Sequence, residues 1–247
     1  PITLEEMDAV KLMNRNDTKF FFHSKQIPSI LHLIRDSYKV LAVNEHRIGK
    51  YITHYYDTPD YAMFLDHHNG KGNRVKIRTR DYLNDNISFL EIKRKTNKGQ
   101  TRKKRIPIDF LNCSLNENGI EYLKDRVDYN PTDLNVSITN SFERITLVHN
   151  TRPGRITIDF NISFQDKDKN SVDVPTLCIT EIKRDGSQES SDIYSYLFYT
   201  LRIKPQGISK YCLGVMLLNK NIKQNTFKEK LLKLQKLFNY DTTSNSR

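Results

Sequence analysis

Residues 73–82 read NRVKIRTRDY, and this stretch decides the fold. Arginine or lysine stands at every second position from Arg74 to Arg80, and valine, isoleucine and threonine fill the positions between them. Alternate residues of a β-strand point to opposite faces of its sheet. The stretch is therefore predicted to be a strand with one basic face and one buried face.

Two further alternating segments follow, at residues 87–95 and 101–110, and turns rich in asparagine and glycine separate them. Glu91 and Lys93 share one face of the first segment, and Lys103 lies on a basic face of the second. The three segments together predict an antiparallel meander.

Alternation and β-branched or aromatic residues predict five more strands. These strands cover residues 19–23, 51–57, 136–148, 155–164 and 176–184. Leucines at helical spacing predict a C-terminal helix over residues 222–240, and no Gly-, Pro- or Ser-rich linker divides the chain. We predict one domain over residues 1–247 with an α+β fold, in which an antiparallel eight-stranded β-barrel is surrounded by peripheral helices.

The charge pattern predicts an anionic ligand. Lys and Arg number 40 against 29 Asp and Glu, which gives a formal net charge of +11. Residues i and i+2 of a strand lie about 6.6 Å apart, so two cations there repel by about 2–3 kcal/mol at an effective dielectric constant near 20. An anion would offset this repulsion. The alternative is an ordinary half-buried sheet whose charged face is solvated.

The residue types favour phosphate as that anion. Arginine matches phosphate oxygens with two donors, and lysine adds a point charge. An eight-stranded closure has room for one slim ligand, such as a linear polyphosphate or a triphosphate end, so no nucleic-acid partner is expected. Glu91 and Glu181 stand among cations, and each is either a ligand of Mg²⁺ or Mn²⁺ or a salt-bridge partner of a neighbouring basic residue.

Two absences in the sequence predict the compartment. No apolar run reaches the length of about 18 residues that a transmembrane helix needs, and the N-terminus has no signal-peptide pattern. Three widely spaced cysteines provide no disulfide framework, which is typical of a reducing compartment. A cytoplasmic location is expected.

Three segments carry a resemblance to a known family. They are YYDTPDYAMFLDHHNGKGNRVKIRTRDY (residues 55–82), FLEIKRK (residues 89–95) and GQTRKKRIPI (residues 99–108). The sequence resembles the VTC (vacuolar transporter chaperone) polyphosphate polymerase domain, a member of the triphosphate tunnel metalloenzymes, which include the CYTH proteins. The resemblance runs over about residues 15–214. It is to the stand-alone bacterial type of this domain. It is compatible with a membrane protein as a partner.

The resemblance also implies site residues. The catalytic set that it implies is Arg78, Arg80, Lys93, Arg144 and Arg155. The substrate-binding set that it implies is Lys19, Arg74, Lys103, Phe142, Ser209 and Lys210. Glu181 matches the glutamate that binds Mn²⁺ or Mg²⁺, whereas Asp17 stands where relatives usually have glutamate. Lys104 would replace Lys103 if the strand register slipped by one residue.

The implied function is metal-dependent phosphotransfer of the polyphosphate kinase type. The γ-phosphoryl group of ATP would pass to phosphate, pyrophosphate or a growing polyphosphate chain. The first alternative is a triphosphatase that hydrolyses inorganic triphosphate or an RNA 5′-triphosphate in the same tunnel. The second is a polyanion-binding module without catalysis, which would show salt-dependent binding and no turnover.

Overall fold

One antiparallel sheet of ten strands forms the centre of the computed structural model, which describes residues 15–151, 153–185, 192–207 and 209–239. The strands are β1 (Arg15–His23), β2 (Tyr38–Val40), β3 (Gly49–Asp57), β4 (Arg74–Tyr82), β5 (Ile87–Lys95), β6 (Thr101–Ile108), β7 (Asn135–His149), β8 (Gly154–Asp166), β9 (Ser171–Val174) and β10 (Leu177–Asp185). Eight of them follow one path, in the order β1-β10-β8-β7-β3-β4-β5-β6. These eight are the strands that the sequence predicts.

The two remaining strands escape the sequence pattern because they are short. β2 has three residues and pairs with β7, and β9 has four residues and pairs with β8. A strand of this length is too short to display an alternation that could be distinguished from a turn.

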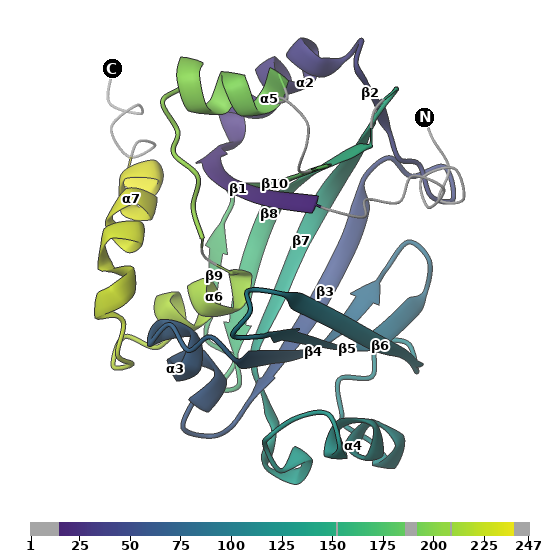
Figure 1. Cartoon of the computed structure of the whole chain (residues 1–247), viewed down its shortest axis with the longest axis vertical. Coiled ribbons are helices and arrows are strands. Elements are labelled where there is room, and N and C mark those ends of the chain that lie inside the picture. Colours follow the sequence, from purple (N-terminus) through teal and green to yellow (C-terminus); the bar gives the residue numbers. More distant parts are fainter. Residues whose placement is uncertain (1–14, 152, 186–191, 208, 240–247) are drawn as a thin grey trace.

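The sheet is strongly curled, so that β4, β5 and β6 lie across from β1 and β10, and the long strands β3, β7 and β8 connect the two halves (Figure 1). The predicted α+β fold with an eight-stranded antiparallel tunnel-like sheet is confirmed. The sheet is nevertheless not closed, because no pairing joins β6 to β1 within the described part of the chain. Four basic residues in succession, from Arg102 to Arg105, give β6 an edge that opposes further strand pairing.

Helices lie at the ends and on the outside of the sheet (Figure 1). They are α2 (Ile27–Ile34), α3 (Ala62–His68), α4 (Glu117–Lys124), α5 (Asp192–Ser195), α6 (Lys210–Leu218) and α7 (Lys228–Asn239). The predicted helix over residues 222–240 begins later than expected, at Lys228, and residue 240 lies outside the described residues. A short 3-10 helix, Asn225–Phe227, precedes it, and Thr226 Oγ1 lies 2.6 Å from His68 Nε2. No helix in the described ranges is both long and apolar enough to cross a membrane.

The hydrophobic core leaves most of the concave face of the sheet free. One cluster, with Phe20 and Ile182, packs against α2 and α5, and a second, with Ile77 and Ile92, packs against the α4 region. These residues alternate with the basic positions along their strands, so they lie on the convex face. The concave face therefore carries the charged side chains.

A third cluster closes one end of the concave face. α6 packs there against β7 and β8, and a Cβ atom at Gly214 would lie 2.7 Å from Phe164 and 2.8 Å from Ile138. The absence of a side chain at Gly214 allows the helix to approach the sheet this closely. The N-terminal residue of α6, Lys210, then reaches the charged face.

Candidate functional site

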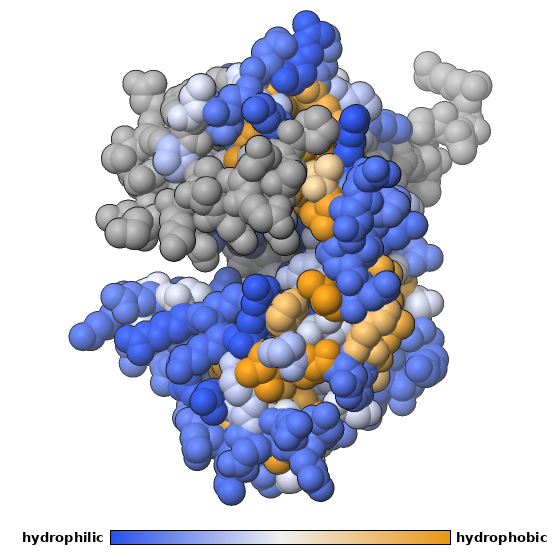
Figure 2. Space-filling view, turned by 90° about the vertical axis from the view of Figure 1, so that its right-hand side faces the viewer, coloured by the Kyte–Doolittle hydropathy of each residue, from blue (hydrophilic) through white to orange (hydrophobic). Residues whose placement is uncertain are grey.

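The curled sheet surrounds a cavity of about 430 Å³, whose lining is dominated by basic residues. The basic lining residues are Lys19, Arg74, Lys76, Arg78, Arg80, Lys93, Lys95, Lys103, Arg144, Lys183 and Lys210, and the acidic ones are Asp17, Glu91, Asp159 and Glu181. Eleven cations therefore face four carboxylates. In the space-filling view the molecule is hollowed at mid-height, with hydrophilic residues along the lower margin of the hollow (Figure 2).

Asp159 of β8 is the most completely paired carboxylate of the lining. Its two oxygens accept hydrogen bonds from Arg144 Nε at 2.5 Å and Arg144 Nη2 at 2.8 Å, and Lys210 Nζ also pairs with it. Burial opposes its charge, but Arg144 and Lys210 hold the pKa of this carboxyl well below its usual range. Asp159 therefore neutralises part of the basic wall and fixes the Arg144 guanidinium.

Glu91 of β5 holds a second pair of cations. Arg78 donates from Nε at 2.7 Å and from Nη2 at 2.6 Å to Glu91 Oε2, and Lys103 pairs with Oε1. The Glu91 side chain is 1% exposed. Burial alone would raise the pKa of Glu91, yet Arg78, Arg80 and Lys103 lower it to about 2. The sequence left Glu91 open as a metal ligand or as a salt-bridge partner, and in the structure it is a salt-bridge partner.

Glu181 of β10 is more accessible than the other two carboxylates. Lys19 Nζ lies 2.5 Å and Lys183 Nζ 3.7 Å from its oxygens, and its side chain is 20% exposed. Burial would raise its pKa, but Lys183 and Lys19 lower it to about 2. An ionised carboxylate is therefore presented at the cavity wall.

Arg80 differs from the paired arginines. Its Nε donates to Thr53 Oγ1 at 3.1 Å, and its guanidinium lies 6.0 Å from the Tyr51 ring and 5.7 Å from the Phe142 ring. No carboxylate of the described chain lies within salt-bridge distance of it, and burial together with Arg78 lowers its pKa. A buried guanidinium without a carboxylate is stabilised by an incoming anion.

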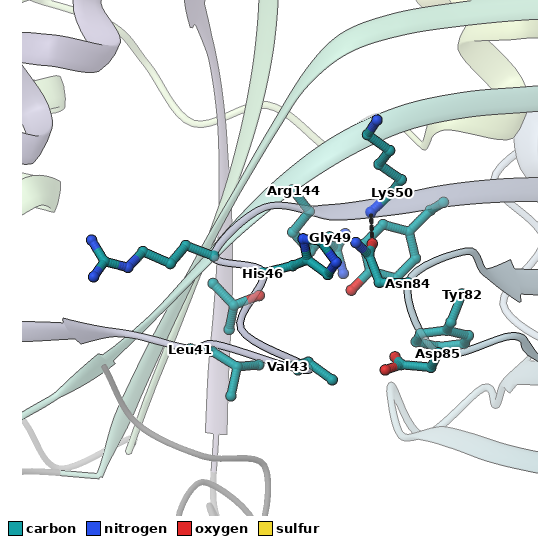
Figure 3. Close-up of a pocket in the computed structure, with 12 residues that line it drawn as sticks. Leu41, Val43, His46, Gly49, Lys50, Tyr82, Asn84, Asp85 and Arg144 are labelled. Atoms are coloured by element: carbon teal, nitrogen blue, oxygen red, sulfur yellow. Dashed lines mark hydrogen bonds between the residues drawn. The ribbon is translucent and has the colours of Figure 1, made fainter.

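A smaller pocket of about 30 Å³ shares Tyr82 and Arg144 with the cavity (Figure 3). The backbone N–H of Lys50 donates to Asn84 Oδ1 at 2.7 Å on its wall. The space corresponds to about one or two water molecules. It is therefore too small to extend the ligand cavity.

A model of the VTC domain family matches residues 14–219. The chain belongs to this family. The matched residues contain all the cavity-lining residues and the complete sheet. Membership of this family supports a role in phosphate chemistry.

Solved structures with a similar fold are remote in sequence from this VTC domain. A candidate adenylate cyclase from Bacillus halodurans superposes with a TM-score of 0.52 at 12% identity, covering 84% of this chain and 100% of that one. A candidate adenylate cyclase from Vibrio parahaemolyticus superposes with a TM-score of 0.47 at 13% identity, covering 81% of this chain and 99% of that one. A candidate adenylyl cyclase from Hippeastrum, with a dominant triphosphatase activity, superposes with a TM-score of 0.45 at 13% identity, covering 83% of this chain and 96% of that one. These likenesses show the fold alone, and no curated protein matches the sequence.

Most site residues predicted from the sequence of the VTC domain lie together in the cavity. Those lining it are Lys19, Arg74, Arg78, Arg80, Lys93, Lys103, Arg144, Glu181, Ser209 and Lys210. The pairing of Lys93 with Lys103 settles the register, so that Lys103 and not Lys104 reaches the cavity. Ser209 caps α6 by accepting the N–H of Cys212 at 3.2 Å.

Two predicted residues do not line the cavity. Phe142 is buried, with its ring stacked on Tyr51 and 4.0 Å from Lys210 Nζ, so it supports the cations from below. Arg155 pairs in register with Lys183 and shares its face of the sheet, but it lies beyond the residues that enclose the cavity. The roles in substrate binding and catalysis that the resemblance implies for these two residues stay predictions.

The site residues that the resemblance implies leave out other lining residues, chiefly Asp159, Lys76 and Lys183. Lys76 lies between Arg74 and Arg78 on the basic face, and the same alternation that selects them also identifies it. Asp159 lies four residues after Arg155 and therefore on its face. Its carboxylate was overlooked because an isolated aspartate in a strand carries no motif.

Three cavity lysines are expected to make the affinity of the VTC domain for anions depend on pH. Burial lowers the pKa of Lys76, Lys103 and Lys210 to about 8. A bound phosphate chain stabilises their charged forms and raises these pKa values, so binding takes up protons near pH 8. We expect the affinity for ATP, measured by calorimetry in EDTA to prevent turnover, to fall above about pH 8 by about tenfold per unit of pH for each lysine that takes up a proton on binding.

The unliganded protein should show the opposite trend. These folded-state pKa values lie below the ordinary 10.5, so the unfolded chain binds more protons and the free energy of unfolding rises from about pH 8 toward pH 10.5.

The proton uptake that is expected on ATP binding is measured directly by calorimetry in two buffers of different ionisation enthalpy. Proton release on binding, or an affinity that does not change through this range, would contradict the assignment.

Proposed function

We propose that this protein is a polyphosphate polymerase that transfers the γ-phosphoryl group of ATP to phosphate, pyrophosphate or the end of a polyphosphate chain. The observation that carries the proposal is the excess of eleven cations over four carboxylates in one cavity of about 430 Å³. A linear phosphate chain is narrow, flexible and uniformly anionic, so it matches a basic lining that extends along several strands.

Arginines and lysines of the cavity would share the recognition of phosphate. Phosphoryl transfer depends mainly on alignment of the reacting oxygens and on neutralisation of their charge. Arg80 and Arg144 would bind phosphate oxygens from one wall, and Lys93 and Lys19 from another. The acceptor is already an oxyanion, so the reaction requires no strong general base.

A divalent metal fits this cavity only as a companion of the substrate. No group of three or more His, Cys, Asp or Glu residues in the described ranges is arranged to hold an ion by itself. Glu181 offers one ionised and partly exposed carboxylate, and Mg²⁺ in nucleotide sites commonly binds one or two carboxylates together with substrate phosphates. Bound Mn²⁺ or Mg²⁺ would neutralise phosphate charge, with Glu181 as its protein ligand.

Triphosphate hydrolysis is the second candidate. The Lys103 side chain is 44% exposed at the margin of the cavity, which keeps water within reach of the bound phosphates. Water would then replace the phosphate acceptor.

ATP is abundant in the cytoplasm, so the proposed reaction is assigned to that compartment.

Incubation with ATP labelled at the γ-phosphate and with Mn²⁺ or Mg²⁺ distinguishes these functions. The proposal expects label in acid-insoluble polymer, in amounts that EDTA abolishes. Label recovered only as orthophosphate would favour the triphosphatase. Tight ATP binding without either product under both metals would contradict an enzymatic role.

A further inference from the structure

The free edge of β6 is a second basic surface of the molecule. β6 ends the strand path of the sheet, and its first five residues, from Thr101 to Arg105, are all exposed. Thr101 and Lys103 line the cavity. Arg102 and Lys104 alternate with them, so they point to the opposite face of the same edge.

The outward-facing cations lack neutralising neighbours. Arg102 is paired in register with Arg94, and like charges directly opposite one another destabilise a sheet. Arg94 is already bound to Asp128 at 3.0 Å and to the carbonyl of Arg126 at 2.8 Å. Lys104 lies opposite Ile92, and in the described chain neither Arg102 nor Lys104 has a carboxylate within salt-bridge distance. An anion at this edge would relieve the repulsion.

The geometry of the edge fits an extended chain. Cations on both faces of β6 place a positive charge about every 3.3 Å along the strand. The unpaired side of an edge strand also presents backbone N–H groups, which can donate to phosphate oxygens. Because Thr101 and Lys103 belong to both the edge and the cavity, a phosphate chain that leaves the cavity here would meet basic groups without interruption.

We propose that the free edge of β6 binds the part of a polyphosphate chain that extends beyond the cavity, with Arg102 and Lys104 as contacts. This inference rests on the proposed function and adds a second binding surface to it. Single-stranded nucleic acid fits less well, because its bases require aromatic surfaces for stacking. β6 carries no aromatic residue, and Arg105 covers the neighbouring Phe89 ring at 4.2 Å.

The test compares two double variants that remove the same charge. Arg102→Ala with Lys104→Ala alters the edge, and Lys228→Ala with Lys236→Ala removes two exposed cations from α7 as the control. Affinities for tripolyphosphate and for long-chain polyphosphate are measured at several salt concentrations, without metal. For the edge variant we expect a loss of about five- to tenfold for the long chain and a salt dependence shallower by about 1.4 in log–log slope. Its affinity for tripolyphosphate should stay within about twofold.

Several results would overturn the assignment of the edge. They are an unchanged affinity for the long chain, an equal loss in the α7 control, and a larger loss for an oligodeoxythymidine than for polyphosphate. Failure of the proposed function is separately visible. Absence of phosphoryl transfer in the wild-type protein overturns only the proposed function, because the binding comparison needs no turnover. A wild-type protein that binds neither tripolyphosphate nor the long chain overturns both the proposed function and the binding role of the β6 edge.

Discussion

Replacing Arg80 with alanine is expected to lower kcat/KM for ATP by about a thousandfold. This guanidinium is buried and held over the Tyr51 and Phe142 rings, and no carboxylate of the described chain lies within salt-bridge distance. Its donors are therefore preorganised for phosphate oxygens, and a fixed donor acts most strongly on charge that develops in the transition state. The loss should appear largely in kcat.

The folded state should tolerate this change. Burial already disfavours the charge of Arg80 and lowers its pKa, so the free energy of unfolding without ligand should not fall. Arg126→Ala is the matched control, because it removes an exposed arginine that lies 4.7 Å from the Tyr122 ring, far along the chain from the cavity residues. Steady-state kinetics showing equal activity for the Arg80 variant and the control would refute the assignment.

Replacing Asp159 with alanine is expected to lower the free energy of unfolding by about 3–5 kcal/mol at low ionic strength. The change leaves Arg144 and Lys210, whose side chains are only 19% and 11% exposed, without their shared carboxylate. Tripolyphosphate should raise the melting temperature of this variant more than that of the wild-type protein, because the anion would replace the missing charge.

An exposed ion pair provides the control for this stability measurement. The Glu229 side chain on α7 is 80% exposed and pairs with Lys233 at 2.6 Å, so Glu229→Ala should leave the free energy of unfolding nearly unchanged and gain nothing from tripolyphosphate. Thermal and urea unfolding measure both variants. An Asp159 variant with wild-type stability would show that Asp159 is not needed to neutralise Arg144 and Lys210. A variant that tripolyphosphate does not stabilise would show that a bound anion cannot take its place.

Alternation, together with β-branched and aromatic residues, was sufficient to predict the eight strands of the main path, although β1 begins at Arg15 and not at Lys19. Between Arg74 and Arg80 each side chain has a defined face, and the burial of Val75 and Ile77 follows from it. The same rule placed Arg78 and Lys93 on one surface. Convergence of these strands around a cavity was expected from the resemblance and is visible in the structure.

Features that depend on contacts between distant strands could not be predicted in the same way. The pairing of Lys93 with Lys103 decides which lysine faces inward, and sequence alone left both Lys103 and Lys104 open. The partner of Arg144, Asp159, is set by the register of β7 and β8 and by a local irregularity in their pairing. The open edge at β6 likewise depends on whether the two ends of the sheet meet, which no local pattern encodes.

The account depends on phosphates binding inside the curled sheet, and a crystal structure of the protein soaked with tripolyphosphate tests this most directly. We expect density for the phosphate chain between Arg78, Arg80 and Arg144, with Lys210 at one end. Tripolyphosphate found only on the convex face, or a cavity that stays free of it at concentrations that saturate binding in solution, would contradict the account.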